Sequence, residues 1–181
     1  MPELASGLIL AGGQGRRMGG RDKGLVEYQG RALVDHVIAR IRPQVNELLI
    51  SANRNTEVYA RRGYPVLADS LPGFQGPLAG VLEGLRVARN DWLLCVPCDM
   101  PNLPQDLLAR MMQVATGFSI VIAIDDERSH PAVMLIRRSL ATELEAFIQS
   151  GQRAMHKFQT QIGFASTRFE QAQMQNVNRL D

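Results

Sequence analysis

The sequence predicts an α/β fold in which helices cover both faces of a mostly parallel β-sheet. Apolar runs typical of strands alternate with helical segments up to residue 96, and this alternation favours parallel strands joined by helical crossovers. A stretch rich in glycine and basic residues, 12–24, directly follows the first apolar run. Because open α/β sheets bind ligands at the carboxyl ends of their strands, we expect a binding crevice at that edge.

Four strands and three helices are expected in the first half of the chain. The strands are expected at residues 8–10, 47–52, 65–68 and 92–96. The helices are expected at residues 34–41, 57–61 and 78–85, and the first and third show apolar residues three or four positions apart. Pro43 and Gly63 are expected to end the first two helices, and residues 72–77 form a loop by composition.

The second half is less regular and is expected to contain an antiparallel strand pair. Residues 119–124 and 132–136 look like strands, and the charged turn between them, 125–131, is too short for a helical crossover. Helices are expected at residues 104–115 and 140–148, a helical turn at 153–158 and a last strand around 164–169. We therefore expect a mostly parallel sheet with an antiparallel strand in the C-terminal half.

The bulk composition fits one globular domain that spans residues 1–181. The chain is 45% apolar and 21% charged with a net charge of +2, which is too balanced for a general nucleic-acid binder. The first residues lack the features of a secretory leader, and no apolar run reaches the roughly 18 residues of a membrane span. A cytoplasmic location is therefore expected.

The cysteines and histidines do not form a pattern typical of redox or zinc sites. Cys95 and Cys98 have CxxC spacing, but they end an apolar strand instead of opening a helix, so core packing is favoured. His36, His130 and His156 are scattered along the chain without the spacing of zinc ligands.

The glycine-rich stretch is predicted to bind an anion. Glycines let backbone N–H groups approach a ligand closely, and basic side chains add charge-assisted hydrogen bonds. A Walker A loop is excluded because Gly24 follows Lys23, where a serine or threonine is required. The dinucleotide fingerprint is disfavoured because Met18 stands where its third glycine is required.

Four predicted strand ends are expected to converge on one crevice. They carry Gly12 and Gly13, Ser51 to Asn53, Asp69, and residues 97–99. Asp99 is the candidate magnesium ligand, because Mg²⁺ needs only one or two carboxylates in addition to substrate phosphates and water. A local turn or helix cap is the alternative role for Asp99 and a stronger alternative for Asp69. Ser51 and Asn53 also suit turns at strand ends.

An anion-binding loop beside a magnesium carboxylate indicates phosphoryl or nucleotidyl transfer, in which catalysis is mostly positioning and charge neutralisation. No catalytic nucleophile is evident, and an anionic phosphate that attacks an α-phosphate needs no general base. Lys23 and one of Arg16 or Arg17 are expected to neutralise the charge that develops on the α-phosphate and the departing pyrophosphate.

Residues 10–23 resemble the signature of nucleotidyltransferases that activate sugar phosphates and related phosphates. Within that superfamily, segments 17–20 and 22–24 are most similar to the molybdenum cofactor guanylyltransferases of the MobA type. The similarity continues through residues 51–54, 69–70, 76–80, 97–101, 130–131 and 176–178. This ordered set covers nearly the whole chain.

The resemblance implies a three-layer α/β/α Rossmann-like nucleotidyltransferase fold and transfer of GMP from GTP to molybdopterin or molybdenum cofactor, with release of pyrophosphate. It implies a nucleotide-binding half at about 1–101 and a pterin-substrate half at about 102–181. The implied nucleotide contacts are Leu10, Ala11, Gly12, Gly13, Lys23, Ser51, Asn53, Asp69, Gly80 and Asp99. The implied catalytic residues are Arg17, Lys23 and Asp99, of which Asp99 also binds Mg²⁺.

Several points stay open at this stage. Ser51 stands where the family usually carries asparagine, and the chain stops soon after Asn178 without the usual closing helix. His130, Arg153 and Asn178 are candidates for the pterin side, although a turn histidine and a solvated arginine explain the first two equally well. Proteins that supply the cofactor, and apo-molybdoenzymes that receive it, are possible partners.

Two other functions remain as alternatives. One is a related nucleotidyltransferase that uses CTP or another NTP on a small phosphate substrate. The other is a non-enzymatic adaptor that delivers cofactor to apoenzymes. Loss of Lys23 or Asp99 would have favoured the adaptor, and both residues are present.

Overall fold

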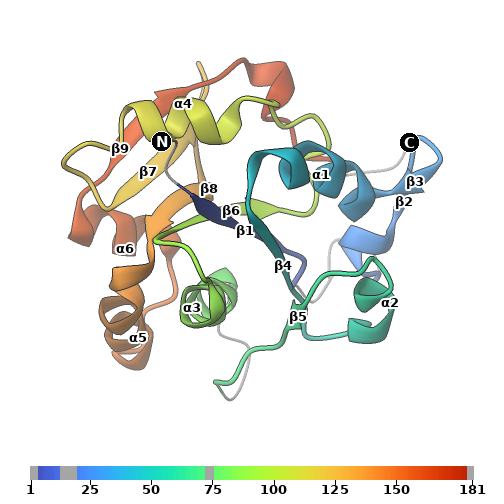
Figure 1. Ribbon diagram of the computed structural model, residues 1–181, viewed down its shortest axis with the longest axis horizontal. Coiled ribbons are helices and arrows are strands. Elements are labelled where there is room, and N and C mark those ends of the chain that lie inside the picture. The colour runs from blue at the N-terminus through green and yellow to red at the C-terminus, as the bar shows by residue number, and fades with distance from the viewer. Residues whose placement is uncertain (1–3, 13–19, 72–75, 179–181) are drawn as a thin grey trace.

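A computed structural model describes residues 4–12, 20–71 and 76–178 of the chain (Figure 1). A seven-stranded sheet, in the order β5-β4-β1-β6-β8-β7-β9, forms its middle layer. The strands are β1 (Ala5–Leu10), β4 (Glu47–Ser51), β5 (Val66–Leu67), β6 (Trp92–Pro97), β7 (Ile120–Ile124), β8 (Ser129–Arg137) and β9 (Ala165–Arg168). A separate antiparallel hairpin consists of β2 (Glu27–Tyr28) and β3 (Arg31–Ala32).

Helices cover both faces of the sheet, which confirms the predicted three-layer α/β/α fold. The α-helices are α1 (Leu33–Ile41), α2 (Thr56–Ala60), α3 (Pro77–Val87), α4 (Leu107–Gln113), α5 (Ala141–Gln149) and α6 (Met155–Ile162). Figure 1 shows α1 and α4 on one face and α3 and α5 on the other. Short 3-10 helices are η2 (Lys23–Leu25), η3 (Arg42–Gln44), η4 (Arg138–Leu140) and η5 (Gln171–Gln173).

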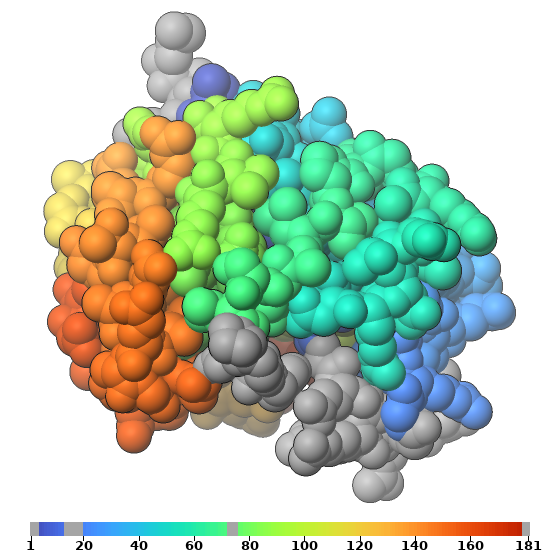
Figure 2. Space-filling view, turned by 90° about the horizontal axis from the view of Figure 1, so that it is seen from below, coloured from blue at the N-terminus to red at the C-terminus, as the bar shows by residue number. Residues whose placement is uncertain are grey.

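Each face of the sheet has its own apolar core, because side chains alternate between the two faces along every strand. Val37 of α1 and Met111 of α4 pack with Ile9 in one cluster. Leu82 of α3 and Phe147 of α5 pack on the other face. Figure 2 looks onto that second face, where α3 in green lies beside the orange helices of the second half.

The central strands are parallel and end at nearly the same level. Strand β1 is buried along its whole length between β4 and β6, as its continuous apolar run predicts. Leu10 lies opposite Ser51 on one side and Pro97 on the other. The polar residues that follow these three strands are therefore brought to one edge of the sheet.

Strand β8 runs antiparallel to both of its neighbours, β6 and β7, whereas β9 is parallel to β7. The predicted antiparallel strand in the C-terminal half is confirmed. The predicted turn at 125–131 is too long, because β8 already begins at Ser129. The register shifts between Ile122 and Ala123, where His130 pairs with Ala123. This irregularity accommodates Pro131 within a strand, as bulges commonly do.

Two further boundaries differ from those expected. The helix predicted at 104–115 is shorter, since α4 spans Leu107–Gln113. The helical turn predicted at 153–158 is instead the longer helix α6. Within the described ranges, every helix is too short or too polar to cross a lipid bilayer.

The cysteines pack in the core, as predicted. Cys95 and Cys98 are both buried and unpaired. Burial raises the pKa of each thiol well above its usual range, so both remain protonated at neutral pH.

Candidate active site

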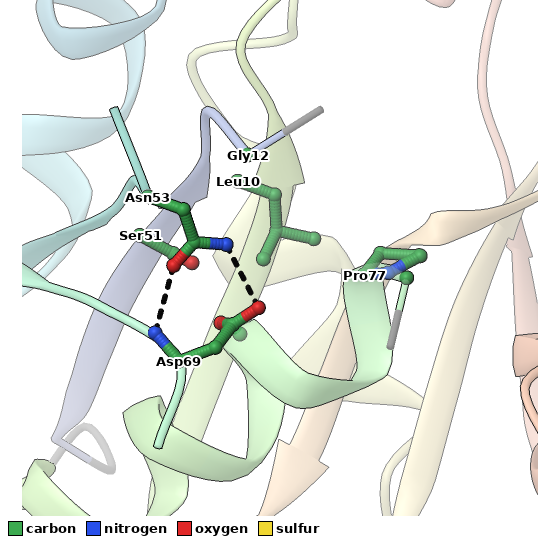
Figure 3. A pocket seen from close by; sticks show the side chains of 8 residues that line it. Leu10, Gly12, Ser51, Asn53, Asp69 and Pro77 are labelled. Atoms are coloured by element: carbon green, nitrogen blue, oxygen red, sulfur yellow. Dashed lines mark hydrogen bonds between the residues drawn. The ribbon is translucent and has the colours of Figure 1, made fainter. Parts of the chain in front are cut away.

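A pocket lies at the carboxyl ends of β1, β4 and β5, against the first turn of α3 (Figure 3). Its lining residues are Leu10, Gly12, Ser51, Asn53, Asp69, Gly76, Pro77 and Gly80. The structure thus brings together six of the predicted nucleotide contacts. Three of the four strand ends converge here, whereas Asp99 at the end of β6 is not among the lining residues.

Asn53 and Asp69 are joined by two reciprocal hydrogen bonds. The side-chain amide of Asn53 donates from Nδ2 to Asp69 Oδ2 at 2.8 Å. The backbone N–H of Asp69 donates back to Asn53 Oδ1, also at 2.8 Å. Both dashed lines are visible in Figure 3. The pair fixes the loop after β4 against the loop after β5, so the two sides of the pocket are held in one arrangement.

Gly80 allows α3 to approach the end of β4 closely. A Cβ atom built on Gly80 would overlap Ser51 Oγ and would lie 3.3 Å from Leu10 Cδ2. Ser51 is itself buried. The Ser51 side chain therefore lies against the backbone of α3 at the base of the pocket.

Replacing Gly80 with alanine is expected to destabilise the fold by about 1–3 kcal/mol, the usual cost of overpacking a closely packed contact. The double variant Gly80→Ala/Ser51→Ala should recover much of this loss, because it removes the overlapping oxygen. Urea denaturation of the two single variants and the double variant measures the coupling. Strictly additive free energies of unfolding would contradict the proposed overlap.

Lys23 and Asp99 form an ion pair at the end of β6. Lys23 Nζ lies 2.6 Å from Asp99 Oδ2. Asp99 is only 8% exposed, and its other oxygen, Oδ1, accepts a hydrogen bond from Asn176 Nδ2 at 3.0 Å. The Lys23 ammonium also donates to Asn178 Oδ1 at 3.0 Å. Two of the predicted catalytic residues, Lys23 and Asp99, are therefore in direct contact. The Asp99 carboxylate bonds to side chains that are distant in the sequence, whereas the alternative interpretation was a local turn or helix cap.

The segment 20–22, which leads into Lys23, is anchored by residues around α2. Arg54 donates from Nη1 to the Gly20 carbonyl at 2.8 Å and from Nη2 to the Arg21 carbonyl at 3.0 Å. Asp22 accepts hydrogen bonds from the Tyr59 hydroxyl at 2.5 Å and from Asn55 Nδ2 at 3.0 Å.

Tyr59 is the buried member of this anchor. Its side chain is fully buried, and burial together with the Asp22 carboxylate raises its pKa far above the usual range. It therefore remains a neutral hydroxyl donor. Asp22 and Arg54 belong to the segments 22–24 and 51–54 on which the resemblance rests. Nothing in the sequence indicates that Asn55, Tyr59 and Asn176 contact this site.

Two of the predicted site residues cannot be placed. Gly13 and Arg17, with Arg16, lie in 13–19, outside the described residues. Ala11 is described and buried, and its backbone N–H donates to the Ser51 carbonyl at 2.8 Å. That N–H is therefore engaged in holding β1 to β4.

His130 and Arg153 have side chains that are already bonded within the protein. His130 is 7% exposed and its Nε2 lies 2.7 Å from Asp125 Oδ2. Arg153 donates to the carbonyls of Ile148 and Gln152, at the end of α5. Of the three candidates for the pterin side, Asn178 is the one that contacts the Lys23–Asp99 pair.

The Asp125 carboxylate organises the turn between β7 and β8. Its Oδ1 accepts the backbone N–H groups of Glu127 at 2.8 Å and Arg128 at 2.9 Å, while Oδ2 contacts His130. The bond with His130, followed by the two backbone donors, lowers the pKa of Asp125 to about 2.

Acid should weaken this turn over a defined range. Because the folded-state pKa of Asp125 is lower than its unfolded value of about 3.9, the carboxylate stabilises the fold above pH 4. That contribution is lost as the pH falls from about 4 to about 2. We expect Asp125→Asn to reduce the fall in unfolding free energy between pH 5 and pH 2, measured by urea denaturation. An unchanged pH dependence would show that Asp125 is not the titrating group.

Asp99 is also the residue that suits a bound Mg²⁺. Within residues 4–12, 20–71 and 76–178, no cluster of three or more acidic, histidine or cysteine side chains could hold a metal ion. A single carboxylate is nevertheless sufficient for Mg²⁺, which takes its other ligands from phosphates and water. Each side-chain oxygen of Asp99 accepts from one donor and keeps a second lone pair, so the donor set fits an ion shared with a phosphate substrate.

Comparisons with known proteins assign the family. Residues 7–163 match the model of the MobA-like NTP transferase domain. A molybdenum cofactor guanylyltransferase from Shewanella sp. (strain MR-4) is 47% identical over 90% of this chain and 83% of its own length. Another, from Shewanella putrefaciens, is 43% identical over 100% of this chain and 95% of its own length.

A solved structure shares the fold. Molybdopterin-guanine dinucleotide biosynthesis protein A from Archaeoglobus fulgidus has a TM-score of 0.75 and 22% identity, and the similarity covers 90% of this chain and 83% of that one. The family match covers most of the described sheet, including the ends of β1, β4 and β6. The chain belongs to the MobA-like NTP transferase family.

Proposed function

We propose that the protein transfers GMP from GTP to molybdopterin or to molybdenum cofactor, forming the guanine dinucleotide cofactor and pyrophosphate. The names of the two Shewanella relatives, at 43% and 47% identity, support this substrate pair. The observation that carries the proposal is the contact between Lys23 and Asp99, next to a pocket at the carboxyl edge of a parallel sheet. This arrangement combines a cation for phosphates with a carboxylate for a divalent ion.

In the proposed reaction, an anionic oxygen of the acceptor phosphate forms a new bond to the α-phosphorus of GTP. The bond between the α-phosphorus and the bridging oxygen to the β-phosphate breaks, and pyrophosphate carries away the electron pair. An attacking phosphate that is already ionised requires no protein base. Lys23 stabilises the negative charge on the triphosphate. Asp69 and Asn53, which are hydrogen-bonded to each other, orient the nucleoside in the pocket.

We further propose that the reaction depends on Mg²⁺, with Asp99 as its protein ligand. The ion supplies charge neutralisation to the phosphates when it is bound. Lys23 and Asn176 hold the two oxygens of Asp99 in a fixed orientation. Arg17 is retained as a proposed catalytic residue on the motif alone.

In this proposal the chain is one domain. Residues from about 1 to 101 bind the nucleotide, and residues from about 102 to 181 bind the pterin substrate. The pocket lies wholly in the first part, and Asn176 and Asn178 bring the second part to the reaction centre. Two unpaired cysteines suit a reducing compartment such as the cytoplasm. Proteins that supply the cofactor, and apo-molybdoenzymes that receive it, are the proposed partners.

Incubation with molybdopterin, Mg²⁺ and each NTP in turn tests the proposal. We expect pyrophosphate release and dinucleotide formation with GTP and little of either with CTP, UTP or ATP. Turnover with CTP and not with GTP would favour the related nucleotidyltransferase. Binding of cofactor without pyrophosphate release from any NTP would favour the adaptor, which the enzyme names of the relatives do not support.

A further inference from the structure

A second cavity, of about 240 Å³, is separate from the pocket at the ends of β1, β4 and β5. It is lined by Asp125, Glu127, Arg128, Gln171, Met174, Gln175 and Asn176. These residues come from the turn between β7 and β8 and from the segment that begins with η5. In the sheet, β4 and β5 lie on one side of β1 and β6, whereas β8 and β7 lie on the other side.

Arg128 connects this cavity to the reaction centre. Its Nη2 donates to Asn176 Oδ1 at 3.3 Å, and Asn176 Nδ2 donates to Asp99 Oδ1 at 3.0 Å. The guanidinium is therefore two hydrogen bonds away from the carboxylate that pairs with Lys23. Asn176 uses both ends of its amide in this chain of contacts, which links the Arg128 guanidinium to the Asp99 carboxylate.

The charge of Arg128 is available to a ligand. Arg62, Arg86 and Arg168 each pair with a carboxylate, but within the described residues no ion pair involves Arg128. Of the two acidic residues at the cavity, Asp125 has both oxygens engaged by His130 and backbone N–H groups, and the exposed Glu127 forms no ion pair within the described residues. An exposed guanidinium without an acidic partner is suited to bidentate binding of a phosphate.

The backbone that carries Arg128 is fixed before any ligand binds. Its N–H donates to Asp125 Oδ1 at 2.9 Å, and its carbonyl accepts the Asp125 N–H, also at 2.9 Å. Asp125 is in turn held by the buried His130. A site that is ordered in advance loses less entropy when it binds its ligand.

We infer that Arg128 binds the phosphate group of the acceptor, which is molybdopterin if the proposed function holds. In phosphoryl-type transfer, the attacking and leaving oxygens are roughly in line through phosphorus. This rule places the attacking phosphate opposite the departing pyrophosphate. The nucleoside pocket occupies the β4 and β5 side of the sheet, and the cavity beside Arg128 on the β8 and β7 side offers the acceptor a separate place. Arg128 thus replaces His130, whose side chain is buried, as the acceptor-binding residue of this turn.

The test compares Arg128→Ala with Arg128→Lys and with the control Arg89→Ala. Arg89 is 88% exposed and precedes β6, so it lies at the opposite edge of the sheet. Binding of molybdopterin in the absence of nucleotide is measured by the quenching of intrinsic protein fluorescence. Steady-state pyrophosphate release gives separate KM values for molybdopterin and GTP.

Loss of a charge-assisted hydrogen bond should weaken molybdopterin binding about 10- to 100-fold in Arg128→Ala. Arg128→Lys should restore part of the affinity, since it keeps the charge but loses the planar fork. Arg89→Ala should match the wild type, and the KM for GTP should change little in any variant. Urea denaturation of all three variants confirms that they fold.

The inference is overturned if Arg128→Ala binds molybdopterin as tightly as Arg89→Ala does. An equal rise in the KM values for GTP and molybdopterin would also overturn it, because that result indicates general damage to the site. Wild-type protein that binds molybdopterin but reacts only with another NTP would refute guanylyl transfer and leave the role of Arg128 intact. Wild-type protein that does not bind molybdopterin would refute both.

Discussion

Replacing Lys23 with alanine is expected to lower kcat/KM for GTP by about 10²- to 10³-fold, the usual effect of removing one preorganised contact to developing charge. The Lys23 ammonium lies 2.6 Å from Asp99 Oδ2 and 3.0 Å from Asn178 Oδ1, so it is held in place before substrate binds. Its loss removes the cation proposed to stabilise the triphosphate. Pyrophosphate release measured at several GTP concentrations gives the effect.

Lys157→Ala is the matched control, because Lys157 is an exposed lysine on α6. Its kcat/KM should remain within about twofold of the wild type, as expected for a surface charge outside the site. Lys23→Arg should retain part of the activity, since the charge remains but its geometry changes. Near-normal turnover by a folded Lys23→Ala protein would remove Lys23 from the mechanism.

Replacing Asp99 with asparagine is expected to lower kcat by about 10²-fold or more, on the scale of other preorganised electrostatic contacts. The amide keeps the shape of the carboxylate but carries no charge. It leaves Lys23 without its acidic partner and removes the proposed Mg²⁺ ligand. A Mg²⁺ titration of pyrophosphate release should show a half-saturating concentration raised about tenfold or more, since weaker coordination is compensated by more ion.

Asp91→Asn provides the comparison, because Asp91 is 77% exposed and directly precedes β6, at the other edge of the sheet. Its turnover and its Mg²⁺ dependence should equal those of the wild type. If Asp99→Asn lowered turnover without changing the Mg²⁺ dependence, Asp99 would act through Lys23 alone. In that case the proposed metal role would be wrong and the ion pair would account for the effect.

The parallel core could be predicted because its signals are local. The run at 92–96 is apolar throughout, as a strand buried on both faces must be, and β6 is fully buried over those residues. Polar residues after β1, β4 and β5 converge because parallel strands end at one edge. Pocket residues such as Ser51 and Asp69 could therefore be identified from their place along the chain.

The contacts around Lys23 and Asp99 could not be predicted, because they join residues that are far apart in the sequence. Tyr59 has the spacing of an ordinary core side chain, and nothing near it indicates that its hydroxyl reaches Asp22. Asn176 lies 77 residues after Asp99. The spacing of apolar residues indicates which face of a helix or strand is buried. It does not indicate which distant loop packs against that face.

The position of His130 was also predicted wrongly from the sequence, for a different reason. Charged residues around it indicated a long turn, but the Asp125 carboxylate closes the turn early with two backbone hydrogen bonds. The irregular register then places Pro131 in β8. The strand consequently starts three residues earlier than the apolar pattern predicts, and His130 is drawn into the interior.

Residues 176–178 contact Lys23 and Asp99, and this affects how the protein responds to partial unfolding. Val177 donates its N–H to the Asp99 carbonyl, and the neighbouring Asn178 bonds to Lys23 across 155 residues of sequence. These few contacts hold a segment that contributes little to either apolar core, so it belongs to the part of the fold that opens at low free energy. Mild denaturant should therefore abolish turnover while far-UV circular dichroism still reports an intact sheet and helices.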